Sequence, residues 1–158
     1  MLITSDIHLS SPDGRWPQTT RQFESFLTKI SKAPPELIFI VGDIVDNATE
    51  SYPGSLSNWK KEWEIYESIK EAHKDIEFKQ SYGTGHDWLN DEMLEILDQE
   101  AGPRHGMFSW RDLNFVWLSF GPGAYFPDAE EHHSDLGKKD ILWLESILSG
   151  VDRTSLMF

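Results

Sequence analysis

The sequence has 158 residues, 39% hydrophobic and 13% aromatic, which is enough apolar material for one core, so we expect a single domain over residues 1–158. Its formal charge of −13, from 27 acidic and 14 basic residues, disfavours nonspecific binding to nucleic acid or anionic membranes. The absence of cysteine excludes disulfides and thiolate metal sites and leaves His, Asp, Glu, Asn or backbone oxygen as metal ligands.

The N-terminus MLITSDIHLS lacks a basic region followed by an apolar core. No apolar run approaches the ~20 residues that span a bilayer. We therefore expect a cytoplasmic protein without a membrane partner.

The first third of the chain has the pattern of a strand, a helix and a second strand. Residues 1–4 form a short apolar run, which predicts a strand. A helix is indicated by apolar residues at helical spacing and ended by two prolines: Phe23, Phe26, Leu27, Ile30, Pro34 and Pro35. The run Glu36–Val41 is almost continuously apolar, as expected for a strand covered on both faces, and it stops at Gly42.

A second helix and a third strand follow. The helix is indicated by residues that share one side and is expected to end near His73: Leu56, Trp59, Trp63 and Tyr66. Ile76, Phe78 and Gln80 then alternate as in a strand. This strand leads directly into the turn SYGTGHD.

The second half of the chain predicts a short helix, a hairpin, a long helix and a final strand. The short helix covers Glu92–Glu100, and the hairpin joins Met107–Trp110 to Asn114–Phe120. After a polar loop over 121–135, an amphipathic helix is marked by Leu136, Ile141, Leu144, Ile147 and Leu148. Thr154–Phe158 has the pattern of a strand.

Three of the predicted strands end in polar clusters. Because ligands of α/β sheets bind beyond the carboxyl ends of the strands, clusters far apart in sequence can meet there. The clusters contain Asp6 and His8 in SDIH, Asp43 and Asp46 in GDIVD, and His86 and Asp87 in GTGHD.

The residue types in these clusters suit metal chemistry. In a strand, the i, i+2 spacing of Asp6 and His8 directs both side chains to one side, where they can bind one cation. Asp43 follows a glycine and offers two oxygens, one for each of two metals. Two ions about 3.5–4 Å apart can activate a water and hold a phosphate for in-line attack.

Each cluster has an ordinary alternative when taken alone. Asp-x-His is often a polar turn at a strand end, and His86 can be a turn histidine with its hydrogen bonds satisfied. Asp46 can cap a helix or hold a metal ligand in place from outside the ligand set. The order of all three clusters, each at a strand end, favours a metal-dependent phosphoesterase.

In these motifs the sequence resembles the calcineurin-like metallophosphoesterase family, whose pattern runs Asp-x-His, Gly-Asp-x-x-Asp and Gly-Asn-His-Asp or Glu. The resemblance extends to FSWRDLNFVWLSF, which is similar to the family's hairpin, and to LGKKDILWLESIL, which is similar to the helix after it. It covers nearly the whole chain.

The resemblance implies an α/β fold in which two mixed sheets stack between helices, a four-layer α/β/β/α sandwich. It implies that Asp6 and His8 bind the first metal and that Asp43 bridges two metals. His86 would donate a proton to the leaving oxygen or bind the phosphate, and Asp87 would orient His86.

The sequence departs from the family pattern in two places. Gly85 stands where the family has an Asn ligand, and the chain ends before the family's later His ligand and its Gly-His-x-His turn. By this comparison residues 1–158 correspond to the N-terminal two-thirds of the family fold, without its C-terminal strands. The retained ligands would hold one ion or none, against two in the family. The other histidines of the second half, His105, His132 and His133, are expected to be solvated.

The sequence therefore predicts a metal-dependent hydrolase of small phosphate mono- or diesters. The alternative is a non-catalytic or truncated family member that acts as a binding or assembly module, with self-association through an exposed sheet edge. The N and O ligands admit Mn²⁺, which we favour, or Fe, Zn²⁺, Ni²⁺ or Mg²⁺.

Overall fold

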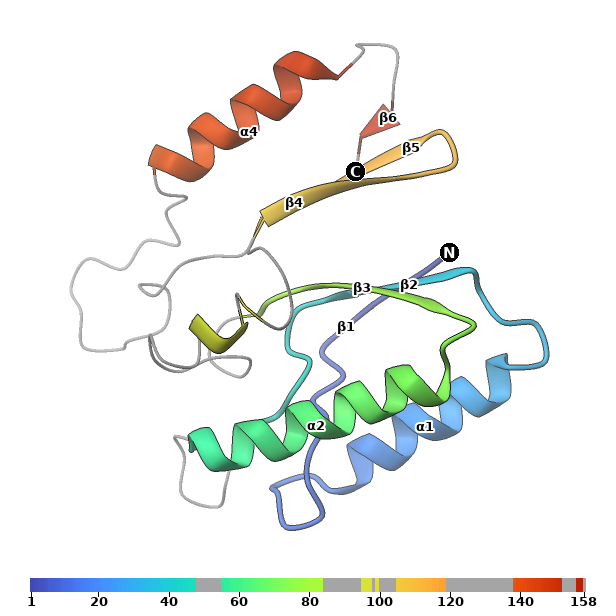
Figure 1. Cartoon of the computed structure of the whole chain (residues 1–158). Helices are drawn as coiled ribbons and strands as arrows, with labels where there is room; N and C mark the ends of the chain where they lie inside the picture. Colours follow the sequence, from blue (N-terminus) through green and yellow to red (C-terminus); the bar gives the residue numbers. More distant parts are fainter. Residues whose placement is uncertain are drawn as a thin grey trace.

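A parallel sheet of three strands forms the centre of the structure, a computed structural model (Figure 1). Its strands are β1 (Leu2–Ser5), β2 (Leu37–Val41) and β3 (Glu77–Ser81), in the spatial order β1-β2-β3. The structure describes residues 1–47, 55–83, 95–97, 99, 105–118, 138–151 and 156–157. The central strand is β2, and four of its five residues are buried, as expected for an apolar strand covered on both faces of the sheet.

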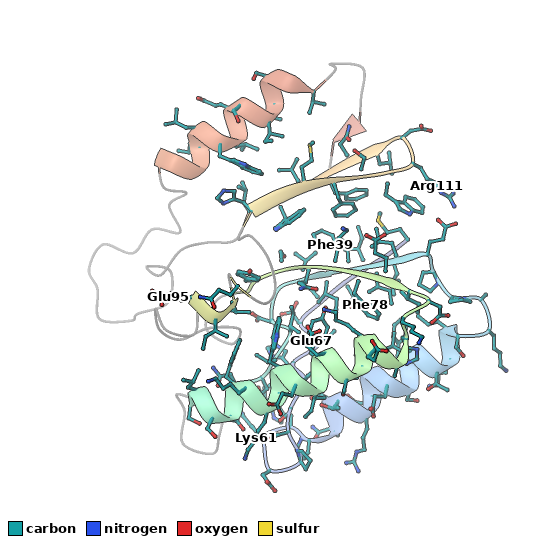
Figure 2. All side chains as sticks on the ribbon, viewed as in Figure 1. Phe39, Lys61, Glu67, Phe78, Glu95 and Arg111 are labelled. Atoms are coloured by element: carbon teal, nitrogen blue, oxygen red, sulfur yellow. The ribbon has the colours of Figure 1, made fainter. Side chains whose placement is uncertain are left out.

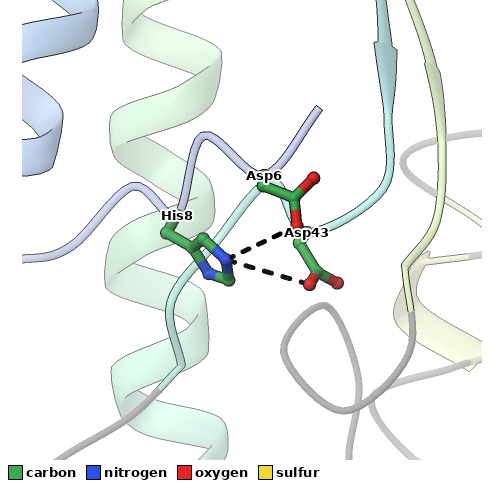
Figure 3. Close-up of side chains that lie close together, drawn as sticks. All are labelled: Asp6, His8 and Asp43. Atoms are coloured by element: carbon green, nitrogen blue, oxygen red, sulfur yellow. Dashed lines mark ion pairs between the residues drawn. The ribbon is translucent and has the colours of Figure 1, made fainter. Parts of the chain in front are cut away.

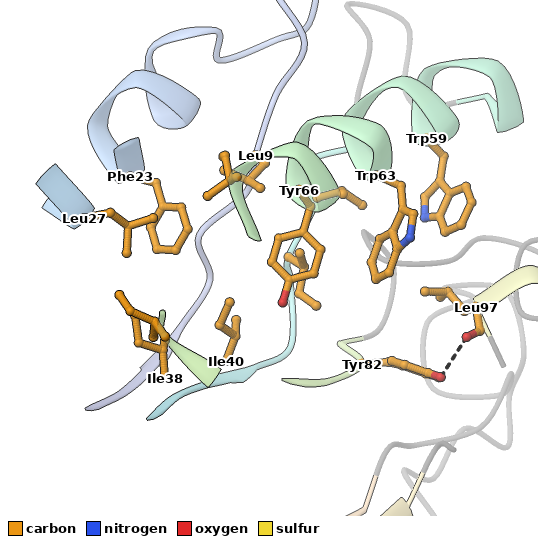
Figure 4. Packing of buried hydrophobic residues seen from close by; sticks show 14 residues of the cluster. Leu9, Phe23, Leu27, Ile38, Ile40, Trp59, Trp63, Tyr66, Tyr82 and Leu97 are labelled. Atoms are coloured by element: carbon orange, nitrogen blue, oxygen red, sulfur yellow. Dashed lines mark hydrogen bonds between the residues drawn. The ribbon is translucent and has the colours of Figure 1, made fainter. Parts of the chain in front are cut away.

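Helices α1 (Gln18–Ile30) and α2 (Leu56–Ala72) lie side by side on one face of this sheet (Figure 1). The main core fills the space between helices and sheet, and Figure 4 shows Ile38 and Ile40 of β2 on its sheet side. Trp59, Trp63 and Tyr66 of α2 form a continuous aromatic row, with ring centroids 5.5 Å and 5.2 Å apart for successive pairs. These are the apolar residues whose helical spacing predicted α2.

The hairpin predicted from the second half is present. Strands β4 (His105–Trp110) and β5 (Leu113–Leu118) pair antiparallel, and β6 (Leu156–Met157) pairs parallel with β5. Arg111 takes the left-handed backbone, φ 54°, in the two-residue turn between β4 and β5.

The two sheets meet through aromatic side chains. Phe39 is on the face of β2 away from the helices, and its ring lies 5.3 Å from that of Phe108 and 6.1 Å from that of Trp117, between centroids (Figure 2). Helix α4 (Lys138–Gly150) follows, and its Trp143 contacts His105 with ring centroids 4.4 Å apart. We expected His105 to be solvated, and this is met only in part, because its ring packs on Trp143 and the residue is half-buried.

The prediction of an α/β chain with two sheets is confirmed. Among the described strands the first sheet contains parallel pairs only, so the expected mixture of directions is met by the second sheet alone. Of the predicted strand at Thr154–Phe158, residues 156–157 are described and form β6. Of the predicted short helix, residues 95–97 and 99 are described and helical. Within the described ranges, no helix has both the length and the apolar character that crossing a membrane requires.

Candidate metal centre

Backbone hydrogen bonds join the carboxyl ends of β1, β2 and β3. The Asp6 N–H donates to the Gly42 carbonyl, with an N···O distance of 3.2 Å. The Gly42 N–H in turn donates to the Ser81 carbonyl, also at 3.2 Å. The three strand ends, where we expected the polar clusters, are therefore connected to one another by backbone hydrogen bonds.

Two loops continue from these strand ends: the β1 loop, residues 6–11, and the β2 loop, residues 42–47. The Leu9 N–H donates to the Ile44 carbonyl at 2.8 Å, and the Asp46 N–H donates to the Leu9 carbonyl at 2.9 Å. The loops therefore run parallel beyond the sheet, in contact with each other.

The turns in these loops are left-handed at residues that are not glycine. The φ angles are 53° at Asp6, 42° at His8, 50° at Asp43 and 42° at Asn47. Asp, Asn and His tolerate this conformation better than most residues. Each such residue still costs on the order of 1–3 kcal/mol, a strain that typically persists at functional sites.

Side chains from the two loops converge on one point (Figure 3). His8 Nε2 lies 4.0 Å from Asp6 Oδ1 and 3.8 Å from Asp43 Oδ2. Because β1 ends at Ser5, the strand alternation that we expected to align Asp6 with His8 is not the cause. The left-handed turns bring these side chains together instead.

The geometry is close to that of a site for one divalent cation and needs only a small movement of the Asp6 side chain. Ligand atoms about 2.0–2.2 Å from an ion stand at most about 4.4 Å apart. One atom from each of Asp6, His8 and Asp43 lies within 4.8 Å of the other two, and among the described residues this is the only such group. The Asp6 side chain is 65% exposed, so it has room to rotate toward an ion. The two carboxylates also compensate the charge of a divalent cation, and the neutral imidazole adds a nitrogen ligand.

Gly83, in the predicted SYGTGHD turn after β3, lies against Asp43 and limits its position. Gly42 takes φ 71° and directs the chain into Asp43. A Cβ placed on Gly83 would overlap the Oδ1 and the backbone nitrogen of Asp43. Position 83 therefore has to be glycine if Asp43 is to keep this place.

The first turn of α1 and the residues before it hold His8. The Thr19 hydroxyl donates a hydrogen bond to the His8 carbonyl oxygen. The Trp16 ring meets the His8 ring edge-on, with centroids 6.0 Å apart and an interplanar angle of 86°. Sequence reasoning missed both residues, because nothing in their spacing links them to His8.

Sequence reasoning also missed Glu62, a fully buried acid on α2. Its Oε1 accepts the Ser11 N–H at 3.1 Å, and its Oε2 accepts the Asn47 N–H at 2.6 Å. Burial raises the pKa of the Glu62 carboxyl, an effect that the bonds from Ser11 and Asn47 oppose and that the nearby Asp46 charge reinforces. A signal was present: an acid on the apolar face between Trp59 and Trp63.

The remaining predicted residues divide into two groups. Asp46 is fully buried in the β2 loop, and α2 is capped by Ser55, so Asp46 is not the cap of that helix. His86 and Asp87 lie outside the described residues, as do Gly85, His132 and His133.

The chain was compared with known proteins. It matches no protein-family model, and a search of curated proteins finds no significant match.

Proposed function

We propose that the protein is a metal-dependent phosphohydrolase, and the convergence of Asp6, His8 and Asp43 carries this proposal. The three side chains come from two strand ends remote in sequence and form a donor set suited to Mn²⁺, Fe, Zn²⁺, Ni²⁺ or Mg²⁺. Mn²⁺ is our first choice. The described ligands are sufficient for one ion.

In this proposal the chain's residues hold the cation and move protons around it. A bound divalent cation supplies Lewis acidity for attack on a phosphoester. Asp6, His8 and Asp43 would hold it, and Asp43 would bridge the two ions if a second one binds. We assign His86 the donation of a proton to the leaving oxygen, and Asp87 the orientation of the His86 imidazole.

The proposal extends to fold and family. We propose that the helices and the two sheets form the four-layer α/β/β/α sandwich of the calcineurin-like metallophosphoesterases. The contact of Phe39 with Phe108 and Trp117 supports it, since it packs one sheet on the other. We also propose a cytoplasmic location.

A groove beside Asp6 offers room for the organic part of a substrate. Its volume is about 290 Å³, and Thr19, Gln22, Phe23 and Phe26 of α1 line one side. The groove has both polar and apolar walls, which suits a small phosphorylated molecule. The net charge of −13 disfavours long nucleic acids.

The experiment combines calorimetric titration of Mn²⁺ with hydrolysis of an aryl phosphate diester. We expect the wild type to bind Mn²⁺ and to release the aryl alcohol, and Asp43→Asn to lose both. Asp75→Asn removes an equivalent charge from an exposed position before β3 and serves as the matched control. A wild type that does not bind Mn²⁺, or an Asp43→Asn variant that binds it equally well, contradicts the proposal.

An assembly role is the second candidate. Among the described strands, β1 pairs with β2 alone, and Ile3 on β1 is 52% exposed. An unpaired edge with an exposed apolar side chain favours pairing with a second copy of the chain. Ile3→Lys should then lower the apparent mass in analytical ultracentrifugation. Mn²⁺ binding without turnover, together with dimers that Ile3→Lys dissociates, would favour this role over hydrolysis.

A further inference from the structure

Glu62 connects the two loops that carry the candidate ligands. Its two carboxylate oxygens are used separately: one accepts from Ser11 at the end of the β1 loop and the other from Asn47 at the end of the β2 loop. Ser11 and Asn47 lie 51 and 15 residues from Glu62 in the sequence. One side chain of α2 thus fixes the spacing between both loops.

A second residue of α2 strengthens this connection on one side. The Ser11 hydroxyl donates to Asn58 Oδ1 at 3.3 Å, and Asn58 lies one helical turn before Glu62. The β1 loop is therefore bound to α2 through both the backbone and the side chain of Ser11. The β2 loop is bound through the backbone of Asn47.

The buried location of Glu62 would be unfavourable for an acid whose only role was to fill space in the core. It is fully buried beside Trp59 and Trp63, where a carboxylate loses its hydration. Apolar side chains of similar volume fill such positions at lower cost. What an apolar side chain could not provide is two acceptors for two backbone N–H groups.

The loops need such support because their backbone is strained. Left-handed residues persist only where surrounding contacts over-determine them. Asn47, which donates to Glu62, is itself left-handed, as are the three candidate ligands. The Glu62 carboxylate therefore holds the ends of the two loops whose left-handed turns set the positions of the candidate ligands.

We infer that Glu62 is a positioning residue, which holds the β1 loop and the β2 loop in the register at which the candidate ligands meet. The inference rests on the proposed metal site for its functional meaning. Glu62 itself touches neither the ion nor the substrate in this scheme. It acts through the backbone of the loops.

The test compares three variants of α2 with the wild type in Mn²⁺ titrations. Glu62→Ala removes both acceptors, and we expect Mn²⁺ affinity to fall about 10–100-fold, as for other residues that hold metal ligands in place. Glu62→Gln keeps one acceptor oxygen and should restore part of the affinity. Ile69→Ala also removes a buried side chain of α2, away from the loops, and should leave Mn²⁺ affinity unchanged.

A second measurement decides the inference independently of metal binding. Amide hydrogen exchange of Leu9 and Asp46 reports the two bonds between the loops in the metal-free protein. We expect these amides to exchange faster in Glu62→Gln and Glu62→Ala while amides of β2 stay protected. Glu64→Gln changes an exposed acid on the same helix and should have no effect.

The outcomes distinguish a failure of the positioning role of Glu62 from a failure of the proposed metal-dependent function. Faster exchange confined to the loops supports the positioning role, even if the wild type binds no Mn²⁺ and the proposed function fails. Exchange that rises equally in the loops and in β2 overturns it, since Glu62 is then a structural residue only. If the wild type binds Mn²⁺, unchanged Mn²⁺ affinity in Glu62→Ala together with unchanged exchange in the loops also overturns it and leaves the metal site standing.

Discussion

Gly83 lies directly against Asp43. A Cβ at position 83 would overlap both the carboxylate and the backbone nitrogen of Asp43, so these two residues approach as closely as a glycine allows. Through this contact the end of β3 limits where the central candidate ligand can stand.

Gly83→Ala is therefore expected to weaken metal binding without removing any ligand. The added methyl group displaces the Asp43 carboxylate, and we expect Mn²⁺ affinity to fall about 10–100-fold. Calorimetric titration measures the change. Gly150→Ala is the control, because a Cβ at Gly150 meets nothing within 4 Å. Equal affinity in both variants would show that Asp43 does not bind the ion from its present position.

Metal should stabilise the fold by mass action. If Mn²⁺ binds the folded chain alone, a concentration of 100 times Kd adds about 2.7 kcal/mol to the free energy of unfolding. Thermal unfolding with Mn²⁺ and with EDTA measures this difference. In Asp43→Asn the two melting curves should coincide, and a wild type with coincident curves would argue against a site that forms on folding.

His86 was assigned to proton transfer rather than to metal binding. His86→Ala should lower the rate of diester hydrolysis by about 10²–10⁴-fold. Mn²⁺ affinity should stay within twofold of the wild type, a limit of about 0.4 kcal/mol in binding free energy. Parallel rate assays and titrations distinguish the roles. Loss of Mn²⁺ binding in this variant would make His86 a ligand instead.

The pKa of Glu62 predicts a pH dependence of stability. Because burial raises the pKa above its usual value of 4.5, the folded chain binds this proton more tightly than the unfolded chain does. The contribution of Glu62 to the free energy of unfolding therefore decreases as pH rises from about 4.5 to the raised pKa, and is constant above it. The negative charge of nearby Asp46 also raises the pKa of Glu62 and so adds to this pH dependence.

Glu62→Gln removes this titration while keeping the size of the side chain. The stability of the wild type relative to Glu62→Gln should therefore decrease with rising pH over that window. Urea unfolding in metal-free buffer at several pH values gives both curves. Curves that run parallel would mean that the folded and unfolded states bind the Glu62 proton equally.

Phe39 should carry much of the contact between the sheets. It is 5% exposed and packs on Phe108 and Trp117, so Phe39→Ala should cost about 3–5 kcal/mol of stability. The near-UV circular dichroism of the aromatic cluster should also change. Ile3→Ala is the matched control, because Ile3 is opposite Phe39 in the register but 52% exposed, and it should cost much less. Similar losses in both variants would contradict this role.

Most elements could be predicted because their signals are local. The apolar run of β2 and the helical spacing of Trp59, Trp63 and Tyr66 each reflect burial of one segment. The meeting of Asp6 with Asp43 was also predictable, since parallel strands bring their carboxyl ends to one edge.

The contacts that hold these ligands in place, made by Glu62 and Trp16, could not be predicted from a local pattern. Glu62 lies in a helix whose apolar spacing is readable, but its two partners are backbone groups of distant loops. Trp16 contacts His8 through a turn whose shape no periodicity encodes.

By itself, the sequence determined which of the described segments are strands and helices, because burial imposes a period on each segment, and that Asp6, His8 and Asp43 lie at one edge of the sheet. Only the tertiary structure decided how those residues face one another. Left-handed turns at Asp6, His8 and Asp43 set the side-chain directions, and Gly83 and Glu62 set the spacing. These features depend on backbone angles and on contacts between segments far apart in the chain, which no local pattern records.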